Sequence, residues 1–92
     1  MEKRTLLPEG YILNGGSRTY IIEKYVSAGS NSIVYQAYYK DTLMPDHRHT
    51  ILLKELYPLD DLGRIYRGSH WSLIVPKEAE TFFEYHQSSY LL

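Results

Sequence analysis

Two features of the sequence have the residue types needed to bind an anion: a run of small side chains and a lysine further along the chain. Small residues occupy positions 27–32 in the sequence S-A-G-S-N-S, and the β-branched pair Ile33–Val34 follows. A turn of small residues between two strands can bring backbone N–H groups close to phosphate oxygens. Lys54 lies within the apolar segment I-L-L-K-E-L, where burial of its charge is costly unless it meets an anion. Together these features predict a site for the phosphates of a nucleotide.

These residues must be positioned by a sheet. Tyrosine, isoleucine and valine dominate three segments of the length expected for strands. The predicted strands are 19–27, 32–39 and 48–57. Short connections between them favour pairing in sequential, antiparallel order. Strand alternation then places Leu52, Lys54 and Leu56 on one face of the third strand.

The remainder of the chain predicts a second hairpin and a helix. Residues 64–67 and 71–75 flank the turn signal G-S-H and are typical of a short hairpin. A helix is predicted from about Pro76 to the end, with the proline in its first turn. Its apolar stripe would comprise Ala79, Phe82, Phe83, His86 and Tyr90. The predicted fold class is α+β, an antiparallel sheet with an extra hairpin and one long C-terminal helix on the Lys54 face.

The order of these motifs resembles the start of a protein kinase domain. The family's G-x-G-x-x-G-x-V falls on Ser27, Gly29, Ser32 and Val34, and its V-A-I-K falls on I-L-L-K ending at Lys54. The E-L-Y-P that follows resembles the K-E-[FLY]-[FY]-P run of many bacterial members. The lead-in L-P-E-G-Y-I-L from Leu7 also resembles bacterial serine/threonine kinases. The resemblance covers roughly residues 6 to 58.

The resemblance implies the small, ATP-binding lobe of an enzyme that transfers the ATP γ-phosphate to protein hydroxyls. Lys54 would orient the α/β-phosphates and pair with a helix glutamate, for which Glu84 is the candidate and Glu80 the neighbouring alternative. Val34 and Leu52 would enclose the adenine. The implied phosphate-covering loop consists of Ser27, Ala28, Gly29, Ser30, Asn31 and Ser32. The catalytic aspartate and the Mg²⁺ ligands of the family are not in these residues, so this stretch alone is not expected to be catalytic.

Departures from the family pattern keep two other interpretations open. Serine replaces glycine at Ser27 and Ser32, and Leu52 stands where the family has a small alanine. Both changes favour a degenerate, pseudokinase-like lobe that binds protein partners. The third interpretation is an unrelated β-rich interaction module. The segment Asp46-His47-Arg48-His49 offers too few ligands for a metal site, and none is predicted.

Composition sets further expectations. The chain has 92 residues, a formal net charge of −1 and no cysteine. It therefore suits one domain in a reducing, cytoplasmic compartment, with no signal favouring nucleic acid or a membrane. The apolar end Y-L-L from Tyr90 suggests that the chain continues in a longer protein. The cleft face with Leu52, Leu56 and the helix end Tyr90-Leu91-Leu92 would be apolar and exposed in such a fragment, which predicts a homodimer through that face.

Overall fold

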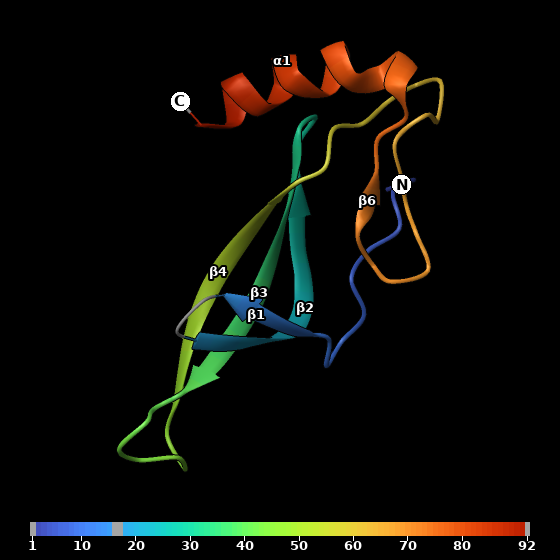
Figure 1. Ribbon diagram of the computed structural model, residues 1–92. Coiled ribbons are helices and arrows are strands. Elements are labelled where there is room, and N and C mark those ends of the chain that lie inside the picture. The colour runs from blue at the N-terminus through green and yellow to red at the C-terminus, as the bar shows by residue number, and fades with distance from the viewer. Residues whose placement is uncertain (1, 16–17, 92) are drawn as a thin grey trace. The chain divides into compact units, whose positions relative to one another are not determined.

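Four strands form one sheet in sequential order (Figure 1). The computed structural model describes residues 2–15 and 18–91. The strands are β1 (Ile12–Gly15), β2 (Arg18–Ala28), β3 (Ser32–Lys40) and β4 (Arg48–Leu56). The mostly antiparallel sheet and the three long strands of the sequence analysis are confirmed. In addition, β1 pairs antiparallel with β2, with Leu13 opposite Tyr20, so the sheet has one strand more than predicted.

The chain divides into two compact units, which are described separately. The first comprises the residues up to 5, residues 28–33 and those from 55 on; the second comprises residues 6–27 and 34–54. We call them the arginine unit and the strand unit, after their contents.

In the strand unit, the core lies on one face of the neighbouring strands β2 and β3. Along β3 buried and half-buried residues alternate, as expected when one face of a strand packs inward. Tyr35 and Ala37 are buried on that strand, with Ile22 from β2 and Leu7 from the lead-in. The Tyr35 hydroxyl accepts a hydrogen bond from the Leu7 backbone N–H at 3.0 Å. The lead-in is therefore fastened to the sheet rather than trailing from it.

In the arginine unit, a hairpin and a helix come after β4 along the chain. The hairpin consists of β5 (Tyr66–Arg67) and β6 (Leu73–Ile74), paired antiparallel, so the predicted extra hairpin is confirmed with shorter strands. The predicted helix over 76–92 is corrected: a 3₁₀ turn (Lys77–Ala79) precedes α1 (Glu80–Leu91). Pro76 is extended, with φ −67° and ψ 161°, and lies before the helix rather than in its first turn. The Ala79 N–H bonds to the Pro76 carbonyl at 2.9 Å, which closes the tighter 3₁₀ turn.

Part of the predicted helix stripe can be located. Ala79 is buried, while Phe82 and Phe83 are half-buried. The side chains of His86 and Tyr90 lie outside the described residues. Among the described residues, no helix has the length and apolar character needed to cross a bilayer.

The arginine unit is built around buried charge. The Arg67 side chain is completely buried, and its Nη1 and Nη2 bind the two carboxylate oxygens of Glu55 at 2.9 and 2.7 Å. The same guanidinium donates to the backbone carbonyls of Thr5 at 2.8 Å and Trp71 at 2.6 Å. A bidentate pair with further carbonyl acceptors compensates the desolvation of a buried guanidinium. Arg67 thereby ties β4, the N-terminal segment and the hairpin together.

We predict that Arg67→Met lowers the free energy of unfolding by about 3 kcal/mol or more, because it leaves Glu55 and two carbonyls without their shared donor. Urea unfolding followed by circular dichroism measures this. The control is Arg48→Met, which removes an exposed arginine stacked on Tyr38 and is expected to cost less than about 1 kcal/mol. Equal losses in the two variants would contradict the structural role given to Arg67.

Candidate functional site

The turn between β2 and β3 contains the residues predicted to cover phosphates. Its backbone is closed by a hydrogen bond of 2.9 Å from the Gly29 N–H to the Ser32 carbonyl. Each carbonyl of residues 29–31 also accepts a hydrogen bond from outside the turn. The donors are Arg4 Nη2 to Gly29 at 2.8 Å, Leu59 N to Ser30 at 2.8 Å and Tyr57 N to Asn31 at 2.9 Å. The turn is thus anchored along its whole length to the segment that follows β4.

Arg4 links this turn to the N-terminal segment. Its side chain is 6% exposed, and its Nε and Nη2 bind the carboxylate of Glu2 at 2.6 and 2.8 Å. Nη1 donates to the Tyr57 carbonyl, and the guanidinium lies 5.7 Å from the centre of the Tyr57 ring. These side-chain hydrogen bonds from Arg4 lower the pKa of Glu2 to about 2. The pair therefore stays ionised at neutral pH and holds Arg4 against the turn.

The backbone at Gly29 does not require a glycine. Its φ is not in the left-handed region, and a Cβ built there meets nothing within 4 Å. Ser27, Gly29 and Ser30 are exposed, Ala28 and Asn31 are half-buried, and Ser32 is buried. The predicted loop therefore exists as a turn, but its conformation is set by the donors on its carbonyls rather than by glycine flexibility.

The predicted nucleotide residues of β3 and β4 lie in the strand unit. Lys54 is exposed on β4, and Leu52, two residues earlier on the same face, is 67% exposed. Val34 is half-buried on the neighbouring strand β3. Leu52 and Lys54 are therefore accessible on this face of β4. This strand is at the edge of the sheet among the described residues. The helix predicted to lie on the Lys54 face belongs to the other unit, so that placement stays a prediction.

The glutamates predicted to pair with Lys54 are on α1. Glu84 and its alternative Glu80 are both exposed on α1, which belongs to the arginine unit. Lys54 belongs to the strand unit, so the pairing of Lys54 with Glu84 stays a prediction. Of the other residues expected on the cleft face, Leu56 is half-buried, and the side chains from Tyr90 on lie outside the described residues.

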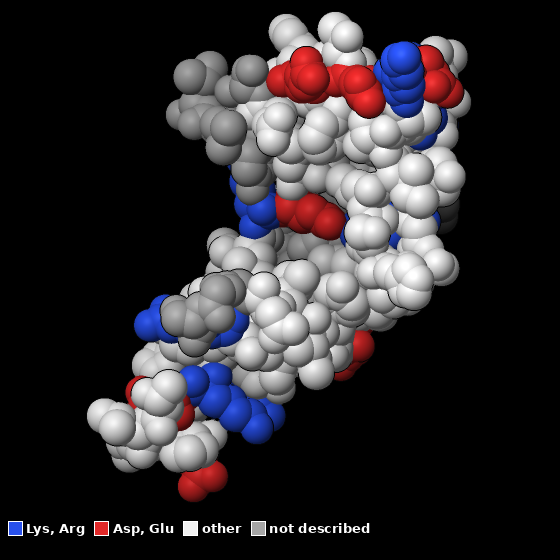
Figure 2. Space-filling model, in the orientation of Figure 1, with Lys and Arg blue, Asp and Glu red and all other residues white. Residues whose placement is uncertain are grey.

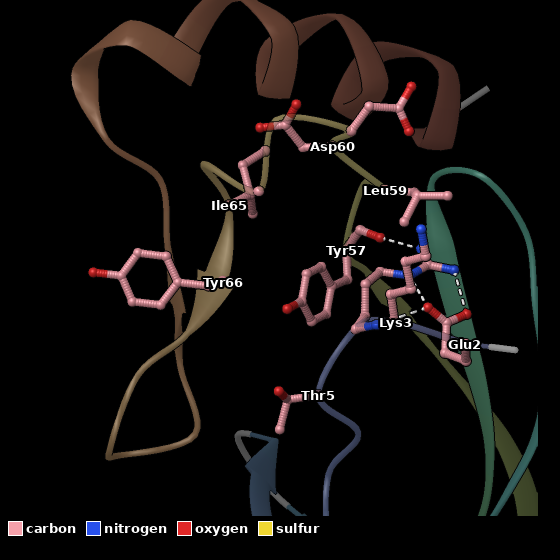
Figure 3. Close-up of a pocket in the computed structure, with 11 residues that line it drawn as sticks. Glu2, Lys3, Thr5, Tyr57, Leu59, Asp60, Ile65 and Tyr66 are labelled. Atoms are coloured by element: carbon pink, nitrogen blue, oxygen red, sulfur yellow. Dashed lines mark hydrogen bonds and ion pairs between the residues drawn. The ribbon is translucent and has the colours of Figure 1, made fainter.

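A hollow of about 430 Å³ lies beside Tyr57 in the arginine unit (Figure 3). Tyr57 and Ile65 are buried, whereas Leu59 is 40% and Tyr66 51% exposed. The complete lining is Glu2, Lys3, Arg4, Thr5, Tyr57, Leu59, Asp60, Asp61, Gly63, Ile65 and Tyr66. Its volume falls within the range of small-molecule pockets, about 300–1,000 Å³. The hollow is thus lined by both apolar and charged residues.

Most of the charge in this hollow is already paired. The carboxylate of Asp60 accepts hydrogen bonds from the Arg64 side chain at 2.9 and 3.2 Å and from two backbone N–H groups. The hydrogen bond from Arg64 is the main cause that lowers the pKa of Asp60. With Glu2 held by Arg4, the exposed charges are those of Lys3 and Asp61. The paired acids stabilise the loop, which makes them poor candidates for acid–base chemistry.

Sequence reasoning missed the buried arginines. Arg4 lies in a charged N-terminal stretch, and Arg67 in a short hairpin strand. The spacing of Asp60 and Arg64 at i, i+4 was a usable signal for an ion pair, but nothing local distinguishes Arg4 or Arg67 from surface arginines. Their burial arises from carbonyl acceptors that are supplied by residues distant in sequence.

Comparison of the chain with protein-family models, with curated proteins and with solved structures finds no match.

We predict that Gly29→Ala changes the free energy of unfolding by less than about 0.5 kcal/mol, because the site has open space and a φ that alanine accepts. Gly10 is the matched control. Its surroundings are equally open, but its φ is +85°, so Gly10→Ala is expected to cost about 1 kcal/mol or more. Urea unfolding compares the two. A larger loss at Gly29 than at Gly10 would show that the turn needs its glycine.

Proposed function

We propose that this chain is the small lobe of a protein-kinase-like domain, whose open sheet face takes part in binding the phosphates of ATP. The observation that carries the proposal is the order of elements. A small-residue turn joins β2 to β3, Lys54 follows near the end of β4, and a hairpin and helix come after. A second lobe, supplied by further chain, would complete the nucleotide site and hold the Mg²⁺ ligands.

In this proposal Lys54 supplies positive charge to the α/β-phosphates, and its exposure leaves it accessible to them. Val34 and Leu52 contribute the apolar surface for the adenine. Catalysis would consist of positioning and charge stabilisation for transfer of the γ-phosphate to a protein hydroxyl. A cytoplasmic setting, where ATP and protein substrates are abundant, is part of the same proposal.

A second candidate function, that of a pseudokinase-like interaction module, is favoured by the anchored turn. Its three carbonyls are engaged by Arg4, Leu59 and Tyr57, so the turn is not free to close over a ligand. Leu52 is also large and 67% exposed where an adenine would need space. A kinase-like lobe with these features would act through protein contacts, without phosphoryl transfer, as a pseudokinase-like interaction module. A homodimer through the exposed face is one form that this contact could take.

Titration of the chain with Mg²⁺–ATP, followed by amide chemical shifts, separates these functions. We predict saturable shifts at residues 27–34 and 52–54 with a dissociation constant between about 1 and 10 mM, because in this proposal these residues are one wall of a two-lobed site. Lys54→Met is expected to weaken this binding about tenfold. Since Lys54 is exposed, the variant should lose less than about 0.5 kcal/mol of stability.

The control variant is Lys24→Met, which removes another exposed lysine, on β2. Its ATP binding is expected to equal that of the wild type. Absence of shifts at residues 27–34 and 52–54 up to about 10 mM ATP would refute the nucleotide proposal and leave the interaction module. In a protein that supplies the second lobe, Lys54→Met is expected to lower phosphoryl transfer by orders of magnitude.

A further inference from the structure

A small hollow in the strand unit differs in its charged residues from the hollow beside Tyr57 and from a further depression described below. It has a volume of about 240 Å³ and is lined by Arg18, Thr19, Ile21, Tyr39, Lys40 and Thr42. Its lining residues include two cations and two hydroxyls but no carboxylate. In contrast, carboxylates line both the hollow beside Tyr57 and the depression of about 400 Å³ that contains Glu9 and Glu23. This chemistry suits an anion.

The guanidinium of Arg18 lies over an aromatic ring. It lies 4.2 Å from the centre of the Tyr39 ring. The His49 ring stacks on the same tyrosine with centroids 4.9 Å apart and planes 19° apart, and Tyr20 meets it edge-on at 5.9 Å. β3 lies between β2 and β4, so Arg18 and His49 reach Tyr39 from opposite sides. A guanidinium held over a ring by its carbon atom still has N–H donors for a bidentate acceptor.

Asp41, the acid next to Lys40 in the sequence, is engaged by other donors. The Asp41 carboxylate accepts hydrogen bonds from His49 Nε2 at 3.0 Å and from the backbone N–H groups of Leu43 and Met44 at 2.8 and 3.2 Å. The hydrogen bond from His49 is the main cause that lowers the pKa of Asp41. Asp41 therefore holds the β3–β4 loop and does not line the hollow that contains Arg18 and Lys40.

The size of the hollow restricts its ligand. Small-molecule pockets typically measure about 300–1,000 Å³, so 240 Å³ suits a small charged group rather than a whole nucleotide. Arg18, Thr19, Lys40 and Thr42 are all exposed and can be reached from solvent. Figure 2 shows basic side chains over this end of the sheet, with acidic side chains nearer the tip of the β3–β4 loop.

We propose that Arg18 and Lys40 form a binding site for a phosphate monoester at this end of the sheet. The Arg18 guanidinium binds two phosphate oxygens, the Lys40 ammonium adds charge, and Thr42 supplies a hydroxyl donor from the same hollow. The Thr19 hydroxyl donates to Asn14 Oδ1 at 3.3 Å and is not counted as a donor to the phosphate. Tyr39 and Ile21 offer an apolar wall for the group that carries the phosphate. The site is independent of Lys54 and of the nucleotide proposal.

Arg48 provides a matched control for Arg18. Its guanidinium also lies 4.2 Å above a tyrosine ring, that of Tyr38, but the depression it lines contains Glu9 and Glu23. The two arginines share the same distance to a tyrosine ring and are both exposed, but the acids around them differ. Nonspecific attraction of an anion would be weakened equally by loss of either arginine, whereas a specific site would depend on Arg18.

The test is titration of the chain with inorganic phosphate, a phosphoserine peptide and AMP, followed by amide shifts at constant ionic strength because screening changes every surface contact. We expect saturable shifts at Arg18, Thr19 and residues 39–42. Arg18→Gln should weaken binding of each probe about tenfold, and Arg48→Gln less than about twofold. The tighter of the peptide and AMP identifies whether the monoester belongs to a protein or to a nucleotide.

Two results would overturn the proposal: no saturable shift at residues 18–19 and 39–42 with any probe, or equal weakening by Arg18→Gln and Arg48→Gln. Both arginines are exposed, so the two variants should fold, and the remaining amide spectrum verifies this directly. The outcome does not depend on Lys54→Met. Failure of this site and failure of the nucleotide proposal are therefore distinguished in the same spectra by the positions of the residues that shift.

Discussion

The arginine unit depends on the packing of two buried guanidinium groups around Tyr57. Arg67 lies 5.2 Å and Arg4 5.7 Å from the centre of the Tyr57 ring, and Tyr57 as a residue is 2% exposed. A buried guanidinium is unfavourable unless its donors are satisfied, and here each has a carboxylate partner and two backbone carbonyls. Those carbonyls belong to segments far apart in the sequence. Satisfying two charges therefore joins the N-terminal segment, the β2–β3 turn, the end of β4 and the hairpin.

This constraint bears on the turn that resembles a phosphate-binding loop. Arg4 contacts Gly29, and the backbone around Tyr57 supplies the donors for the next two carbonyls. A loop that closes over a ligand needs freedom to move, whereas this turn would have to break three hydrogen bonds first. The anchored turn is therefore a preformed surface and not a loop that moves over a ligand. This is the strongest physical reason to consider protein binding as the alternative to nucleotide binding.

The sheet was predictable from the sequence because its physics is local. Alternation and β-branched residues located β2, β3 and β4, and the turn predicted at residues 28–31 followed from small residues between the strands. The helix start was misplaced because Pro76 is compatible with either the first turn or the residue before it, and only the 3₁₀ turn ending at the buried Ala79 decides between them. Arg4 and Arg67 were not predictable, because their burial depends on carbonyls at Tyr57, Gly29 and Thr5 that a linear pattern cannot reveal.

Native-state hydrogen exchange tests the anchoring of the turn most directly. The amides of Tyr57 and Leu59 donate to the Asn31 and Ser30 carbonyls, so their exchange reports how often the turn separates from this segment. We predict that both amides are protected to nearly the same degree as those in the middle of β3. Exchange of Tyr57 and Leu59 as rapid as that of the exposed Asp61 amide would contradict the account, and it would show that the turn is free to move over a ligand.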